Sequence, residues 1–112
     1  MEAKDKQVLQ KIYDHICSVL KYCEGCSTLS EFQNDSMRVE ACVFNLMQIG
    51  ELAKQSLSDE AKLQIKTIPW KQIYGMRNRI VHGYSGVNML IVWDTIHDDL
   101  PELKKELKAY IK

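Results

Sequence analysis

The densest group of side chains that could carry out chemistry lies between Arg77 and Tyr84. Within it, His82 can exchange protons near neutral pH, and the guanidinium group of Arg77 has a fixed charge and a shape suited to paired contacts with phosphate. Together they suit RNA cleavage without a metal ion. A base would remove the ribose 2′-hydroxyl proton, that oxygen would attack the adjacent phosphorus, and arginine would stabilise the developing phosphoryl charge, giving a 2′,3′-cyclic phosphate. The alternative is structural, because a histidine near a helix C-terminus interacts favourably with the helix dipole.

The spacing within this group decides which side chains can meet on one helix. Asn78 and His82 are four residues apart and share a helix face, and Arg79 is a near neighbour three residues before His82. Arg77 precedes His82 by five positions, which corresponds to about 140° around a regular helix. We therefore expect these two to share a site only if the helix unwinds, if the arginine reaches around it, or if a second copy of the chain completes the site.

The charge of the chain is zero overall but unevenly distributed. No aspartate or glutamate occurs from Ala61 to Trp93, while that segment contains five basic residues, Lys62, Lys66, Lys71, Arg77 and Arg79. The remainder of the chain therefore has a net charge of minus five. A basic segment that also contains Trp70, Tyr74 and Tyr84 could offer phosphate contacts and stacking surfaces to RNA. The alternative is a solvated basic face with its aromatic side chains in the core.

The composition predicts one globular domain over residues 1–112, with 46% apolar and 27% charged residues. Because 15 basic residues balance 15 acidic ones, global attraction to nucleic acid or to an anionic membrane is excluded. The densest apolar run, Met89 to Trp93, is much shorter than the roughly 18 residues of a membrane span. The charged start leads into no apolar stretch, so we expect no signal sequence and a cytoplasmic protein.

Apolar residues recur at intervals of three and four, which predicts an all-α fold. Residues 24–27 should end the first helix, and Thr28 with Glu31 could cap a short turn before the second. The last helix should kink or break after Asp99 or Leu100, because Pro101 cannot continue interior helical hydrogen bonding. Residues 58–68 should connect helices with at most one helical turn. The four expected helices are Lys4 to Cys23, Asp35 to Ser56, Pro69 to Gly83 and Asn88 to Tyr110.

The helix expected over residues 35–56 has two apolar stripes. One contains Val39, Cys42, Val43, Leu46 and Ile49, and the other Met37, Ala41, Phe44 and Leu52. A helix of this kind lies centrally in a bundle or uses its second stripe on a partner chain, so we expect a homodimer. Gly50 is a candidate for a close helix contact. Glu51 could pair with an arginine of the 77–84 group or lie at the surface.

Metal-binding patterns are weak in this chain. Cys23 and Cys26 form one C-x-x-C pair, which Cys17 and Cys42 could complete in principle, but the spacing matches no recognisable zinc motif and ordinary reduced thiols are favoured. The acidic residues Asp94, Asp98 and Asp99 could suggest a carboxylate cluster, although an exposed acidic stripe is the commoner arrangement. His15 and His97 are expected to face solvent. We expect no metal and no cofactor.

The run from Arg77 to Tyr84 matches the R-x4-H-x-Y motif and resembles the HepT-like ribonucleases of the HEPN (higher eukaryotes and prokaryotes nucleotide-binding) superfamily. Other segments resemble that family in the same order, namely Ile49 to Ala53, Ile68 to Trp70, Met76 to Asn78, and Val92 with Trp93. The resemblance implies an antiparallel four-to-five-helix bundle that forms a homodimer, with paired motifs forming an RNase site at the subunit cleft.

The resemblance also implies roles for individual residues and partners. Arg77 and His82 would be catalytic, with Asn78 and Arg79 as supporting residues. The chain would be the toxin of a toxin-antitoxin module, and a minimal nucleotidyltransferase (MNT) antitoxin would silence it by adding AMP to Tyr84. A noncatalytic helical module that binds nucleotide or docks such a transferase is the competing hypothesis, which an RNA cleavage assay separates from the first.

Overall fold

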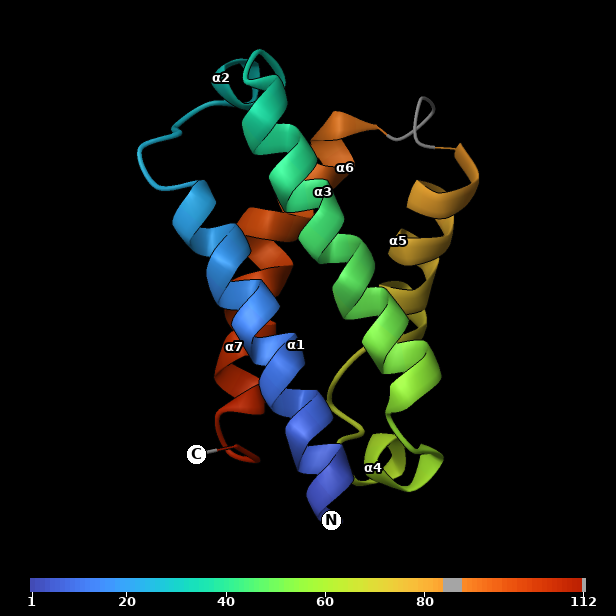
Figure 1. Cartoon of the computed structure of the whole chain (residues 1–112). Coiled ribbons are helices and arrows are strands. Elements are labelled where there is room, and N and C mark those ends of the chain that lie inside the picture. Colours follow the sequence, from blue (N-terminus) through green and yellow to red (C-terminus); the bar gives the residue numbers. More distant parts are fainter. Residues whose placement is uncertain (84–87, 112) are drawn as a thin grey trace.

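The computed structural model describes residues 1–83 and 88–111, and the side chains of residues 80–83 are outside this description. Neighbouring long helices alternate in direction, with α1 running up, α3 down, α5 up and the α6 to α7 segment down (Figure 1). No strand occurs in the described ranges, so the all-α prediction is confirmed. The α-helices are α1 (Ala3–Tyr22), α2 (Leu29–Gln33), α3 (Ser36–Glu51), α4 (Asp59–Gln64), α5 (Trp70–Gly83), α6 (Met89–Asp94) and α7 (Leu100–Leu107).

The connection from α1 to α3 follows the turn chemistry of the sequence. Gly25 has a φ of +79°, the left-handed conformation that glycine adopts without steric cost. Thr28 then caps α2, since its Oγ1 accepts a hydrogen bond from the backbone N–H of Glu31 at 3.1 Å. Asp35 caps α3 in the same way, accepting from the N–H of Arg38 at 3.1 Å. The predicted start of the central helix is therefore confirmed.

Helix α3 is the central element, because it packs against both α1 and α5 (Figure 1). Its first stripe is buried as predicted, whereas Met37 and Phe44 of the second stripe are 80% and 53% exposed. The helix continues past Glu51 as a π-helical segment, Leu52–Ser56. The predicted span is thus correct, but its last turn is wider than a regular α-helical turn.

The last helical segment changes its hydrogen-bond pattern just before Pro101. A π-helical segment, Thr95–Asp99, separates α6 from α7, and Pro101 lies in the first turn of α7. The helical backbone is continuous through this point, since the N–H of Leu100 donates to the carbonyl of Thr95, so the predicted break takes the form of a wider turn just before the proline. The inward face is retained across the break, with Val92, Ile96, Leu100, Leu103 and Leu107 all buried.

A buried carboxylate joins the start of α1 to the start of α4. Asp5 is only 6% exposed and accepts hydrogen bonds from the backbone N–H of Ser58 at 3.0 Å and from its hydroxyl at 2.6 Å. The same hydroxyl oxygen of Ser58 accepts from the N–H of Ala61 at 3.1 Å and so caps α4. One polar group therefore fixes two helix ends that are distant in the sequence.

The prediction that His15 faces solvent is wrong. Its ring is half-buried, and its Nδ1 lies 2.7 Å from the side-chain oxygen of Asn45, a buried residue of α3. The amide nitrogen of Asn45 donates to the carbonyl of Ala41 at 2.7 Å, so its oxygen remains to accept from the histidine. His97 is exposed as expected, with its ring centroid 3.8 Å from that of Trp93.

None of the helices in the described ranges combines the length and the apolar character needed to cross a membrane.

Candidate active site

Aromatic side chains hold α5 in place at its N-terminal end. The indole N–H of Trp70 donates to the carbonyl of Ile65 at 3.2 Å, and the hydroxyl of Tyr74 donates to the carbonyl of Ala53 at 3.3 Å. The ammonium group of Lys62 lies 5.1 Å from the centre of the Tyr74 ring. Both rings are half-buried and engaged with neighbouring segments, which favours an anchoring role over a stacking surface for these two aromatic residues.

The crossing of α3 and α5 depends on Gly50. A Cβ atom built at this position would overlap the Cβ of Arg77, and it would lie 2.9 Å from the Cγ of Arg77 and 3.3 Å from the carbonyl oxygen of Ile73. Only glycine lets the two backbones approach this closely. The predicted close helix contact at Gly50 is confirmed, and it involves the first residue of the R-x4-H-x-Y motif.

The next residue of α3, Glu51, holds the head of the same arginine. Its Oε2 accepts a hydrogen bond from the Nε of Arg77 at 2.8 Å and forms an ion pair with the Nη2 at 2.7 Å. The Nη1 of Arg77 donates to the side-chain oxygen of Asn78 at 2.9 Å. Of the two interpretations that the sequence left open for Glu51, pairing with a motif arginine is the correct one.

The contacts of Arg77 leave part of its guanidinium group available. The side chain is 17% exposed and that of Glu51 is 41% exposed, so the pair lies at the surface with its arginine largely enclosed. Guanidinium has five N–H donors, of which Glu51 and Asn78 take three by the contacts among the described side chains. One N–H remains on each Nη nitrogen, which provides two donors for a phosphate oxygen.

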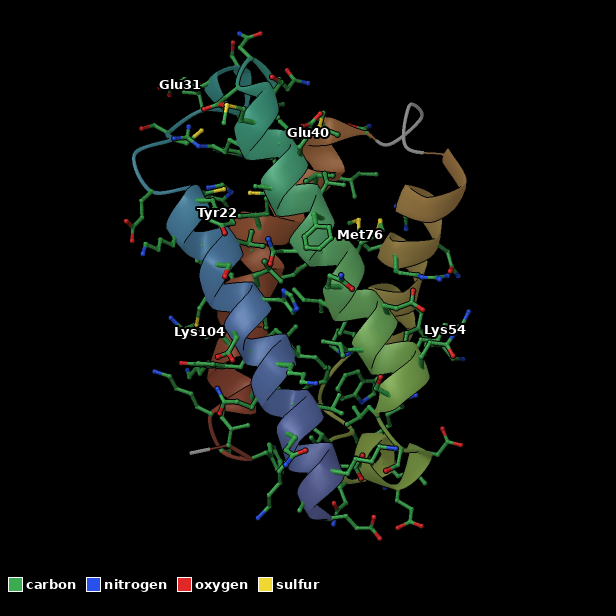
Figure 2. The ribbon with its side chains drawn as sticks, viewed as in Figure 1. Tyr22, Glu31, Glu40, Lys54, Met76 and Lys104 are labelled. Atoms are coloured by element: carbon green, nitrogen blue, oxygen red, sulfur yellow. The ribbon has the colours of Figure 1, made fainter. Side chains whose placement is uncertain are left out.

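Arg79 points to another side of α5. It is exposed and lines a groove of about 440 Å³ between α5 and the α6 to α7 segment, together with Met76, Asp98 and Asp99. Figure 2 shows Met76 in the space between α5 and α3. The structure therefore brings Asn78 to Arg77 and directs Arg79 to this groove, since residues two positions apart on a helix face different sides.

Two of the predicted site residues fall outside what the structure describes. The backbone of His82 belongs to α5, but its side chain is among those not described, and Tyr84 lies in the undescribed range 84–87. Their contacts with Arg77 or with RNA therefore stay predictions.

The acidic wall of the groove belongs to the segment around the second π-helical turn. Burial raises the pKa of the Asp99 carboxyl above its ordinary value, and the neighbouring charges of Asp98 and Asp94 add to this effect. Across the described part of the chain, no three histidine, cysteine or acidic side chains are placed to hold a metal ion. The groove therefore combines apolar side chains with acidic ones and with Arg79.

All four cysteines are free thiols. Cys23, Cys26 and Cys42 are buried, and the Sγ atoms of Cys23 and Cys42 lie 3.6 Å apart. The hydrogen bond with Cys23 raises the pKa of Cys42, and burial raises it further. These thiols pack as part of the core between α1 and α3.

Comparisons with known proteins agree with the motif. The family model described as Ribonuclease HepT-like matches residues 12–110. The protein named Putative RNase TTE0752, from Caldanaerobacter subterraneus subsp. tengcongensis, is 38% identical over 104 residues, covering 93% of this chain and 91% of its own length. Probable ribonuclease HepT from Thermococcus cleftensis is 30% identical over 113 residues and covers 100% of both chains. No solved structure matches this chain. The resemblance inferred from the sequence is confirmed.

Proposed function

This chain belongs to the HepT-like ribonuclease family, and we propose that it is a metal-independent endoribonuclease that acts as a toxin in the cytoplasm. Arg77 and His82 are its catalytic residues in this proposal. The observation that carries it is the guanidinium group of Arg77, held at the surface by Glu51 and Asn78, which leave two of its N–H donors unused among the described side chains.

The chemistry follows from these groups. His82 takes the proton of a ribose 2′-hydroxyl, and the oxygen attacks the adjacent phosphorus. The remaining N–H groups of Arg77 stabilise the charge that develops on the phosphoryl oxygens. The bond to the 5′ oxygen breaks, and this oxygen takes a proton from solvent water and leaves as a hydroxyl; protonated His82 then returns its proton to the hydroxide. No step needs a metal ion.

Incubation of the purified chain with RNA in the presence of a chelator tests this function. We expect cleavage products with 2′,3′-cyclic phosphate and 5′-hydroxyl ends. A chain that leaves RNA intact but forms a stable complex with a nucleotidyltransferase is instead the noncatalytic docking module.

A homodimer would complete the site, and α3 offers a surface for it. Met37, Phe44 and Glu51 are each seven residues apart and therefore lie on one face of the helix. The first two are the exposed apolar residues of the second stripe, and the third contacts Arg77. A second copy that covers Met37 and Phe44 would place its own motif beside the first. Arg77 and His82 are five positions apart, which is about 140° around a regular helix. This offset also favours a site that two copies of the chain complete together.

We expect Phe44→Asp to weaken this dimer at least about 30-fold, because truncation or charging of a central apolar anchor costs about 2 kcal/mol or more. Leu63→Asp is the matched control, since Leu63 is 66% exposed on α4 and away from this stripe. Sedimentation velocity over a range of concentrations measures both. Equal association of the Phe44→Asp and Leu63→Asp variants would contradict the assignment of this surface.

The partner in this proposal is an MNT-family nucleotidyltransferase antitoxin that adds AMP to Tyr84. An added nucleotide is bulky and anionic, and two residues from His82 it would obstruct the site and compete with RNA phosphates. When the chain is produced together with its transferase, we expect its intact mass to rise by AMP units that map to Tyr84. Tyr84→Phe should remove the shift. An unmodified chain that is still inhibited would show inhibition by binding alone.

A further inference from the structure

We infer that Glu51 is a positioning residue for RNA cleavage, because it fixes the direction in which Arg77 presents its free N–H groups. This inference rests on the proposed ribonuclease function. Glu51 touches neither the reacting phosphate nor the 2′-hydroxyl in this assignment, and it acts through Arg77.

The geometry restrains the arginine at both ends. At its base, the Cβ and Cγ of Arg77 lie against Gly50, where no side chain intervenes between α3 and α5. At its head, a single oxygen of Glu51 accepts a hydrogen bond from Nε and forms an ion pair with Nη2, which occupies one edge of the planar group. Asn78 takes one N–H of Nη1. The plane of the guanidinium group is thereby set before any RNA binds.

The carboxylate of the pair is open to solvent, although the arginine is largely enclosed. Glu51 is 41% exposed, and ion pairs open to solvent contribute little to folding stability. A long arginine side chain has many rotamers, so holding it in one of them lowers the entropic cost of forming the transition state. The consequence of the Glu51 contact is therefore orientation rather than stability of the fold.

The charge of Glu51 also makes a role in RNA affinity implausible. A carboxylate beside the phosphate site repels the phosphate, and it neutralises part of the attraction exerted by Arg77. Removing the charge should leave RNA binding unchanged or tighter, while the rate of the chemical step falls. A slower chemical step with unchanged or tighter RNA binding distinguishes a positioning role of Glu51 from a role in attracting RNA.

The test compares Glu51→Gln with Glu40→Gln. Both glutamates lie on α3, but Glu40 is exposed at the upper end of the helix (Figure 2), far along it from Glu51. We expect kcat of Glu51→Gln to fall roughly 100-fold with KM unchanged or lower, and Glu40→Gln to match the parent. In an Arg77→Ala background, Glu51→Gln should cause no further loss, since the two residues act as a unit. Thermal unfolding checks that each variant is folded.

An NMR measurement tests positioning without activity. The Nε–H resonance of Arg77, assigned by its absence in Arg77→Lys, should be sharp and slow to exchange in the parent and in Glu40→Gln, and it should broaden or vanish in Glu51→Gln. If the parent does not cleave RNA, the proposed function fails. The NMR comparison still decides whether Glu51 holds Arg77. Three results would overturn the inference: an unchanged resonance, parental kcat in Glu51→Gln, or an additional loss in the Arg77→Ala background.

Discussion

Replacing His82 or Arg77 by alanine is expected to remove most RNA cleavage. Loss of a general base typically lowers a rate by roughly 10² to 10⁴-fold, and loss of a group that stabilises developing phosphoryl charge by roughly 10² to 10³-fold. Arg77→Lys should not restore the rate, because an ammonium group cannot bind Glu51 and Asn78 and still offer two donors in one plane. Initial rates of cleavage of a labelled RNA, measured with chelator present, give these ratios.

Lys71→Ala is the control for these variants. Lys71 is an exposed basic residue of the same helix, so its removal changes the charge of α5 by the same amount as Arg77→Ala. We expect it to cleave RNA nearly as the parent does. Expression of each variant in cells adds a second readout, since a toxin without its nuclease should no longer arrest growth. Parental cleavage and growth arrest in both His82→Ala and Arg77→Ala would disprove the mechanism.

Gly50→Ala is expected to destabilise the fold even though alanine is the better helix former. The intrinsic gain from replacing a mid-helix glycine is about 1 kcal/mol. The new Cβ would overlap the Cβ of Arg77, an atom that can move only if the helix moves with it. Forcing packed elements apart costs about 1 to 3 kcal/mol and sometimes more, so we expect a net loss of about 1 kcal/mol or more in the free energy of unfolding.

Gly75→Ala is the control that separates the steric effect at Gly50 from the general effect of replacing a helical glycine. Gly75 lies in α5, and a Cβ there would meet only the Nη2 of Arg79, at 4.0 Å, among the described atoms outside its own helix backbone. We expect this variant to be as stable as the parent or more stable by about 1 kcal/mol. Urea unfolding measures both changes, and opposite signs are the expected result. Cleavage should fall in Gly50→Ala alone, because the displaced helix takes Arg77 away from Glu51.

The helices and the reason for the Gly50 contact could be predicted from local patterns. Amphipathic periodicity, capping residues and Pro101 each act within a few residues, so they located the helix ends and the irregular turn before α7. The two π-helical segments were not foreseen. A wider turn holds one extra residue whose place is set by packing against other helices, and the sequence of the segment alone does not show it.

The candidate site was predictable only in part, because its contacts depend on how neighbouring helices pack. Periodicity shows which residues share a face of one helix, but not which neighbouring helix that face meets. Spacing placed Arg79 near His82 on the helix, but it could not show that the Arg79 side of α5 faces the groove beside α6 and α7. Glu51 could be proposed only as one of two alternatives, and His15 was misassigned, because both depend on how α3 lies against its neighbours.

The buried contact between Asp5 and Ser58 makes one end of the bundle sensitive to acid. The hydroxyl of Ser58, and then its backbone N–H, hold the pKa of Asp5 below its ordinary value of 3.8. A carboxyl with a lowered folded-state pKa stabilises the fold fully above the unfolded value, and this contribution is lost as the pH falls through the folded value. Strong acid would therefore release α4 from the N-terminus of α1 at the lower end of the molecule (Figure 1). At neutral or mildly acidic pH the Asp5 carboxylate stays ionised, and its contact with Ser58 is kept.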